Sequence, residues 1–126
     1  MNVFSSITEE SFSYLINEYG FSEPVATDGS WKTTFFYEKS DIAIEIELNY
    51  REMDAFVYMI KLENGKLPND HESARKMLEV LINVEPVKSN GDHTTIQQFE
   101  KGITNKSTLL KNNLNEILKT REKVFL

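Results

Sequence analysis

The chain has 126 residues, of which 40% are hydrophobic, and its 20 acidic and 14 basic side chains give a formal net charge of −6. It contains no cysteine, which excludes disulfides, thiolate catalysis and cysteine-ligated zinc. This length suits one domain, residues 1–126, with a single hydrophobic core. An apolar run of the ~18 residues that a membrane helix needs is absent, and the N-terminus lacks the pattern of a signal peptide, so we expect a cytoplasmic protein.

The charge is distributed unevenly along the chain. Residues 1–63 hold 12 acidic and 4 basic side chains, a net of −8, whereas residues 64–126 hold 8 acidic and 10 basic ones, a net of +2. An acidic surface repels nucleic acid and speeds the encounter with basic proteins. Two interpretations stay open: a surface for a basic partner, or acid that only keeps a bacterial cytosolic protein soluble.

The first predicted element is a helix. Ser6 and Glu9 have the spacing of a capping box, and an earlier start at Val3 or Phe4 stays open. Gly20 suits the position after a helix end, with Phe21 making the closing apolar contact. Residues 22–30 are rich in turn-forming residues and predict a loop. Apolar side chains at helical spacing form the predicted inner face of this helix: Phe12, Leu15, Ile16 and Tyr19.

Residues 31–62 predict an antiparallel β-meander with strands over 31–37, 41–50 and 53–62. In the middle strand, apolar and polar residues alternate, which places one set in the core and the other on a wet face. We expect Val57 and Met59 of the third strand on the side of Glu45 and Glu47, where they favour partial cover. The predicted core set of the middle strand is Ile42, Ile44, Ile46 and Leu48.

The second half predicts helices over residues 71–83, 94–101 and 107–120, with a loop near Asn90 and Gly91. Asp70 or Ser73 can cap the first helix, Gly102 ends the second, and Ser107 can cap the last. Because strands cluster and helices flank them, the chain predicts an α+β fold. We expect an N-terminal helix, a three-stranded antiparallel β-meander, and two or three C-terminal helices packed on one sheet face.

Residue patterns that carry chemistry are weak in this chain. Glu45 and Glu47 would place their Cβ atoms ~6.5–7 Å apart, which overlaps the carboxyl separation of inverting glycosidases, but any solvated strand with alternating glutamates gives the same spacing. We therefore predict a solvated face, no catalytic residue and no cofactor, and an enzyme is the less favoured class. The basic side chains near the C-terminus are expected to be solvated: Lys101, Lys106, Lys111, Lys119, Arg121 and Lys123.

The two histidines, His71 and His93, are isolated in the sequence. Neither has a second histidine at i+4, the spacing that metal sites on helices use. They could form a metal site only if the fold brought Asp70, Glu72 and Asp92 together around them. We expect surface histidines and no metal.

Aromatic residues are concentrated in the predicted sheet. Phe35 and Phe36 are adjacent on one strand, so at least one of them must lie on the face of Glu45 and Glu47. An aromatic ring beside carboxylates is typical of an interface anchor within a charged rim. An equal alternative is that another helix, or a homodimer partner, covers that spot. The partner-binding residues that this pattern predicts are Phe35, Phe36, Glu38, Asp41, Glu45 and Glu47.

The helix end from Phe12 to Phe21 and the meander from Phe35 to Leu62 resemble, in general character, those of small bacterial immunity proteins. The resemblance implies a compact α+β protein that places acid against a basic toxin domain, and it assigns a role to no individual residue. Two alternatives stay open. One is a structural homo-oligomer that associates through the meander edge or residues 124–126. The other is a small-ligand binder or enzyme with a pocket between sheet and helices.

Overall fold

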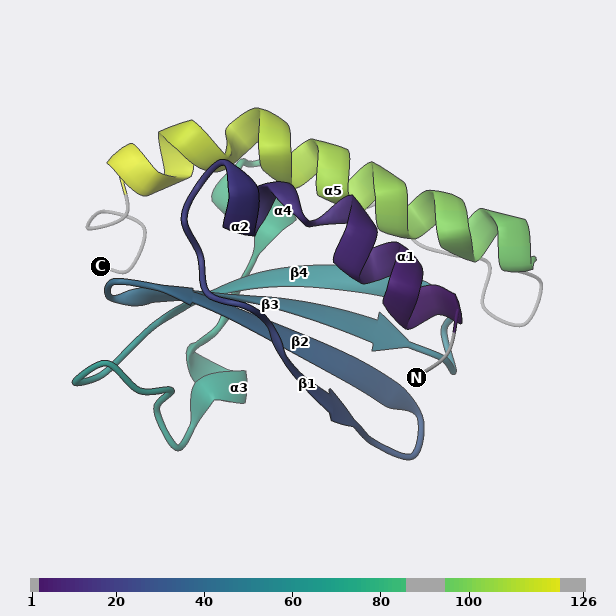
Figure 1. Cartoon of the computed structure of the whole chain (residues 1–126), viewed down its shortest axis with the longest axis horizontal. Coiled ribbons are helices and arrows are strands. Elements are labelled where there is room, and N and C mark those ends of the chain that lie inside the picture. The colour runs from purple at the N-terminus through teal and green to yellow at the C-terminus, as the bar shows by residue number, and fades with distance from the viewer. Residues whose placement is uncertain (1–2, 86–94, 121–126) are drawn as a thin grey trace.

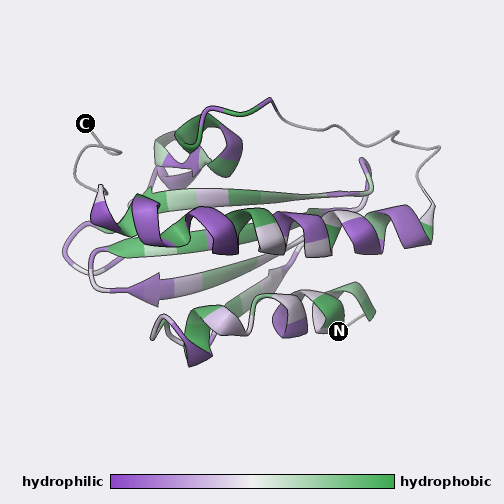
Figure 2. Cartoon of the chain, turned by 90° about the horizontal axis from the view of Figure 1, so that it is seen from above, coloured by the Kyte–Doolittle hydropathy of each residue, from purple (hydrophilic) through white to green (hydrophobic). Residues whose placement is uncertain are grey.

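The computed structural model describes residues 3–85 and 95–120, and it has an α+β fold in which helices lie on both sides of an antiparallel sheet (Figure 1). Helix α3 lies on one side of the sheet and the remaining helices lie on the other. Seen from above, α1 and α5 lie side by side over the sheet (Figure 2). The helices are α1 (Val3–Ser11), α2 (Tyr14–Asn17), α3 (His71–Ala74), α4 (Leu78–Leu81) and α5 (Ile96–Lys119).

The sheet has five antiparallel strands in the spatial order β1-β2-β3-β4-β5. The predicted meander forms the three central strands, but the prediction missed the two edge strands. β1 lies within the predicted loop 22–30, and β5 is only two residues long. Both strands are too short to show an alternation of apolar and polar residues in the sequence. The strands are β1 (Val25–Asp28), β2 (Lys32–Lys39), β3 (Ile42–Asn49), β4 (Asp54–Lys61) and β5 (Lys76–Met77).

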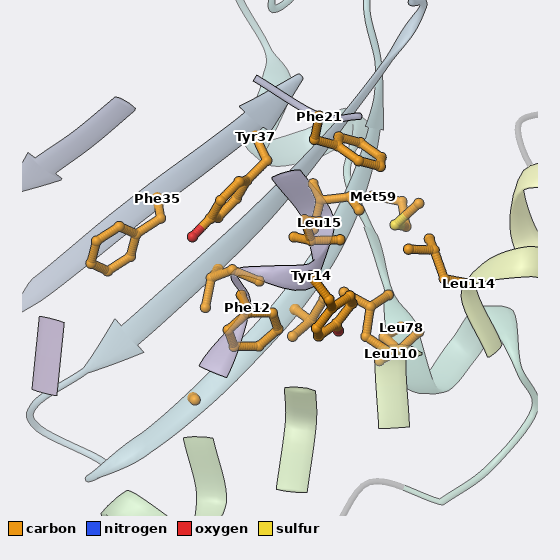
Figure 3. Packing of buried hydrophobic residues seen from close by; sticks show 14 of the residues in the cluster. Phe12, Tyr14, Leu15, Phe21, Phe35, Tyr37, Met59, Leu78, Leu110 and Leu114 are labelled. Atoms are coloured by element: carbon orange, nitrogen blue, oxygen red, sulfur yellow. The ribbon is translucent and has the colours of Figure 1, made fainter. Parts of the chain in front are cut away.

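The sheet face below α1, α2 and α5 forms the main core (Figure 3). Ile44 pairs with Tyr37 and Met59 on the neighbouring strands, and Ile46 pairs with Phe35 and Val57. All six side chains are fully buried. The core set of β3 is therefore confirmed, but the expected placement of Val57 and Met59 beside Glu45 is wrong. Asn49 pairs with Asp54 across the β3–β4 turn, and this register places Val57 and Met59 on the core face.

The N-terminal helix is interrupted. The predicted cap at Ser6 is wrong because Ser6 lies inside α1, and the helix begins at Val3, the earlier start that the sequence left open. The apolar stripe and the helix end are confirmed: Leu15 is fully buried, Gly20 has a φ of +75°, and the Phe21 N–H donates to the Leu15 carbonyl. Helix α5 ties the two pieces together. The Tyr14 hydroxyl donates to the Ser107 carbonyl at 2.7 Å, and the Ser107 hydroxyl donates to the Ser11 carbonyl at 2.6 Å.

The predicted helix over residues 71–83 is broken into α3, β5 and α4. Arg75 and Met77 have extended backbone, with ψ of 148° and 140°. Met77 pairs with Tyr58 at the free edge of β4, so tertiary strand pairing overrides the helical spacing of the apolar residues. The expectation of one continuous helix here is wrong.

The two predicted C-terminal helices are one helix, α5, of 24 residues. Thr95 caps it through a capping box with Gln98, whereas the predicted helix end at Gly102 and cap at Ser107 lie in its interior. Within residues 3–85 and 95–120, the helices lack the combination of length and hydrophobicity that crossing a membrane requires. The loop predicted near Asn90 and Gly91 lies outside the described residues.

Candidate functional site

The sheet face opposite the main core is covered by residues 62–75, which we call the outer segment. The segment leaves β4 with the Leu62 N–H donating to the Asp41 carbonyl at 2.8 Å, and it turns at Asn64 and Gly65. Both turn residues have positive φ, as an Asn-Gly type I′ turn requires. Leu62 then packs against Ala43 and Ile60 in a small second apolar cluster, with Phe36 and Leu67 at its margin.

Beyond α3, Arg75 at the end of the outer segment reaches two buried glutamates of β3. Its Nη1 donates to Glu45 Oε2 at 2.9 Å and to Glu47 Oε1 at 3.4 Å. The guanidinium carbon lies 3.8 Å from the centroid of the Tyr58 ring, within cation–π range. Tyr58 pairs directly with Glu45 across β3 and β4, so the ring and the carboxylate share one face. We call Arg75, Glu45, Glu47 and Tyr58 the Arg75 site.

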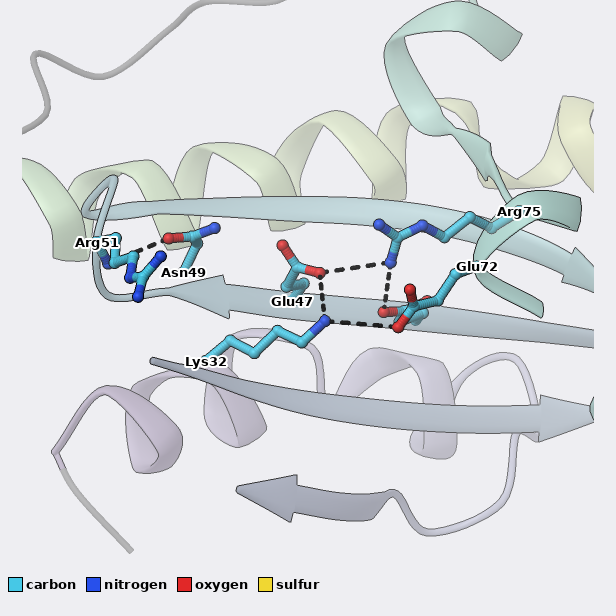
Figure 4. A network of polar contacts seen from close by, with 7 residues as sticks. Lys32, Glu47, Asn49, Arg51, Glu72 and Arg75 are labelled. Carbon is cyan, nitrogen blue, oxygen red and sulfur yellow. Dashed lines mark hydrogen bonds and ion pairs between the residues drawn. The ribbon is translucent and has the colours of Figure 1, made fainter. Parts of the chain in front are cut away.

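A lysine extends the network toward the surface (Figure 4). Lys32 Nζ lies 3.6 Å from Glu47 Oε1 and 3.7 Å from Glu72 Oε1 of α3. Three carboxylates (Glu45, Glu47, Glu72) therefore face two cationic side chains (Arg75, Lys32), and the cluster keeps a formal charge of −1.

The prediction of a solvated face is wrong at its centre. Glu45 is 1% exposed and Glu47 is 5% exposed, because the outer segment and Arg75 cover them. The sequence pattern could not show this, since alternation looks the same whether a polar face meets water or other polar side chains. One oxygen, Glu45 Oε1, is buried and accepts no hydrogen bond within the part of the chain that the structure describes.

The ionisation of the Arg75 site is unbalanced. Burial raises the pKa of Glu45 above its ordinary value, and the charge and hydrogen bond of Arg75 pull it down only in part. Burial acts to lower the pKa of Arg75, but Glu45, Tyr58 and Glu47 together raise it. Burial also raises the pKa of Tyr58 to about 12. The site thus favours the charge of Arg75, whereas the charge of Glu45 is compensated incompletely.

The six predicted partner-binding residues are distributed over both faces. Phe35 is fully buried in the main core, whereas Phe36 pairs with Glu45 and is half-buried on the outer face. This confirms that the two rings separate. Glu38 is half-buried on the outer face and Asp41 is exposed in the β2–β3 turn. Partner binding by these residues stays a prediction, and Glu45 and Glu47 are covered in this conformation.

Sequence reasoning missed Arg75 as a site residue and misjudged Lys106. Lys106 was expected to be solvated, but it forms a buried ion pair with Glu79, between α5 and α4. No local signal marked Arg75, because Arg75 and Lys76 are adjacent basic residues that look like ordinary polar positions of the predicted helix over 71–83. Nothing local indicates which carboxylate such a residue meets.

The histidines are placed only in part. His71 lies on the outer face with its ring edge-on to Phe36, at a centroid distance of 5.7 Å, and its charge lowers the pKa of Glu45. His93 lies outside the described residues. Across residues 3–85 and 95–120, no group of three or more side chains of the metal-binding types is arranged to hold an ion.

The chain matches no family model, no curated protein and no solved structure in the comparisons with known proteins.

Proposed function

We propose that the protein is a protein-binding module that takes up a basic partner on its outer face, as the resemblance to small bacterial immunity proteins implies. One observation carries the proposal: the outer face already binds cationic side chains. Glu45 and Glu47 hold Arg75, and Glu47 and Glu72 flank Lys32. A surface that holds cations from its own chain has the chemistry to hold cations of another.

Further acidic side chains with accessible surface lie on the outer face and on the outer segment that covers it. The outer segment carries three acidic residues, and apart from Arg75 its one lysine or arginine is Lys66. Such a rim attracts a basic partner at long range and raises its association rate, an effect that salt screens. Half-buried Phe36 offers an aromatic anchor within the rim. The acids of this rim are Glu38, Glu63, Asp70 and Glu72.

Selection from a random-peptide display library on the immobilised protein tests the proposal. We expect enrichment of peptides rich in arginine and lysine, and dissociation constants that rise with ionic strength. The double variant Glu38→Lys and Asp70→Lys should weaken these peptides by about tenfold or more, because like charges then meet at the rim.

The matched control reverses two exposed glutamates on the helix side of the molecule, Glu10→Lys and Glu116→Lys. It changes the net charge by the same amount, so a purely global charge effect would weaken binding equally in both double variants. That result, or enrichment of peptides without basic residues, would contradict the proposal. Within the immunity class the partner would be a basic toxin domain, and its complex should show the same response to the two double variants.

A further inference from the structure

Arg75 uses only part of the hydrogen-bonding capacity that surrounds it. Among the described residues, Nη1 is the guanidinium nitrogen that donates to both Glu45 Oε2 and Glu47 Oε1. Glu45 Oε1 is buried and receives no hydrogen bond from residues 3–85 or 95–120, although a carboxylate can accept two parallel N–H bonds from one guanidinium. The site therefore has an unfilled acceptor where a better-placed guanidinium could bind in bidentate fashion.

The shape and chemistry of the site select arginine among cations. A planar, delocalised guanidinium can lie on the Tyr58 ring and still direct N–H groups at carboxylates beside the ring. A lysine ammonium is a compact, strongly hydrated charge and gains less from an aromatic face. In the structure, the Arg75 guanidinium lies on Tyr58 and donates to Glu45 Oε2 at 2.9 Å, whereas Lys32 Nζ lies 3.6 Å from Glu47 Oε1.

The segment before Arg75 is attached lightly, whereas the residues after it are held in the sheet, because Lys76 and Met77 pair with β4. Helix α3 has four residues and buries none of them, and Ser73 and Ala74 before Arg75 are exposed. The firmer contacts of the outer segment lie further back, at Leu62 and Pro68. Because β5 holds the backbone after Arg75, its guanidinium could leave the site by rotation of the side chain together with a local movement of α3, while the main core stays intact.

We propose that the Arg75 site is an arginine receptor, and that Arg75 occupies it in place of an arginine side chain of a basic partner protein. The inference rests on the proposed function and names the chemistry of its contact. Exchange of one guanidinium for another leaves the charge of the site unchanged, so the incoming arginine avoids the penalty of leaving Glu45 and Glu47 buried together without a cation. Arg75 then acts as an internal competitor that weakens the binding of other, non-specific cations to the site.

The test uses the full chain with Arg75→Ala and the probe N-acetyl-arginine N-methylamide. At about ten times its dissociation constant, the probe should raise the Tm of Arg75→Ala by about 4 °C. The corresponding blocked citrulline, which has the same shape without charge, should not raise it, and blocked lysine should bind at least about tenfold more weakly. Adding Glu45→Gln to Arg75→Ala should abolish the shift. Wild type should show no shift at this concentration, because Arg75 fills the site.

Should Arg75→Ala fail to fold alone, recovery of its native circular dichroism by the arginine probe, and not by the citrulline probe, becomes the readout. Absence of both a shift and a recovery, or equal effects of the arginine and lysine probes, would overturn the inference. The proposed function fails separately. If wild type selects basic peptides through the rim while the probe has no effect on Arg75→Ala, the module stands and the arginine receptor does not.

Discussion

Along β3 the two faces of the sheet are equally buried but are built from opposite chemistry. Ile44 is 0% exposed below the helices, and its neighbour Glu45 is 1% exposed below the outer segment. The first face is covered by α1, α2 and α5 through apolar contacts, and the second is covered by the outer segment through an arginine, a lysine and a small apolar cluster. Burial alone therefore does not distinguish an apolar core from a face that is covered through charged side chains, whereas the chemistry of the cover does.

The faces also differ in what they contribute to folding. Burying the four large apolar side chains of β3 contributes roughly 6–12 kcal/mol before conformational entropy, at ~1.5–3 kcal/mol each. A buried ion pair contributes little net stability, because the cost of removing two charges from water offsets their attraction. The helix-covered face thus determines whether the chain folds, and the outer face is free to specify what meets it.

The largest expected effect is on the helix-covered face. Ile44→Asp places an uncompensated carboxylate in the main core and should lower the free energy of unfolding by more than about 5 kcal/mol, which unfolds the protein. Circular dichroism and urea titration measure this, with Ile44→Val as the control, which should cost only about 1 kcal/mol. A soluble Ile44→Asp variant that melts cooperatively would refute the assignment of this face.

Local pattern was enough to predict the helix-covered face from sequence. The alternation of β3 identified Ile42, Ile44, Ile46 and Leu48, and all four are fully buried. The left-handed turn at Gly20, shortly after α2 ends at Asn17, followed from the same kind of local signal, because a left-handed φ suits glycine. These features depend on residues close together in the chain.

The outer face could not be predicted, because it depends on contacts between distant residues. Arg75 meets Glu45 across thirty positions of sequence, and Met77 leaves its helical pattern to pair with Tyr58. The missed strand β1 is likewise defined by its pairing with β2 and not by its own composition. The candidate site is assembled almost wholly from such long-range contacts, so its key residue was overlooked although its glutamates were noted.

A smaller effect is expected from alanine substitutions at two glycines, one in the helical cover and one in the outer segment. Gly20 and Gly65 have φ of +75° and +77°, and an added Cβ at either would meet no atom within 4 Å. Alanine should therefore cost about 1 kcal/mol of backbone strain at each position. Gly65→Ala should speed hydrogen exchange of the Leu62 and Lys66 amides by about fivefold through local opening of the outer segment.

Gly20→Ala is the matched variant for this comparison. It should lower the Tm by about 4 °C and leave the exchange of those two amides by local opening unchanged. Equal acceleration at both amides in the two variants would mean that the outer segment and the helices open together, and the distinction between the covers would then be lost.

The smallest effect concerns the charge of Glu45. Because burial raises its pKa in the folded state, the folded chain binds this proton more tightly than the unfolded chain. The stabilisation is present below the ordinary pKa of about 4.5 and is lost as pH rises through the folded value. Glu45→Gln should change stability by less than about 1 kcal/mol at pH 7. In urea titrations at pH 5, 6 and 7, the variant should also lack the decline in the free energy of unfolding that Glu45 causes as pH rises.

Glu10→Gln, at an exposed position of α1, controls for the loss of one negative charge in this experiment. The groups around Glu45 set the sign: Glu47 acts with burial, whereas Arg75 and His71 act against it. If wild type instead gained stability over Glu45→Gln as pH rose from 5 to 7, the carboxylate would be fully compensated by Arg75. The ion pair of the outer face would then stabilise folding, as the apolar core does, and the two faces would no longer differ in this respect. Glu45 would then have no spare capacity for the arginine of a partner.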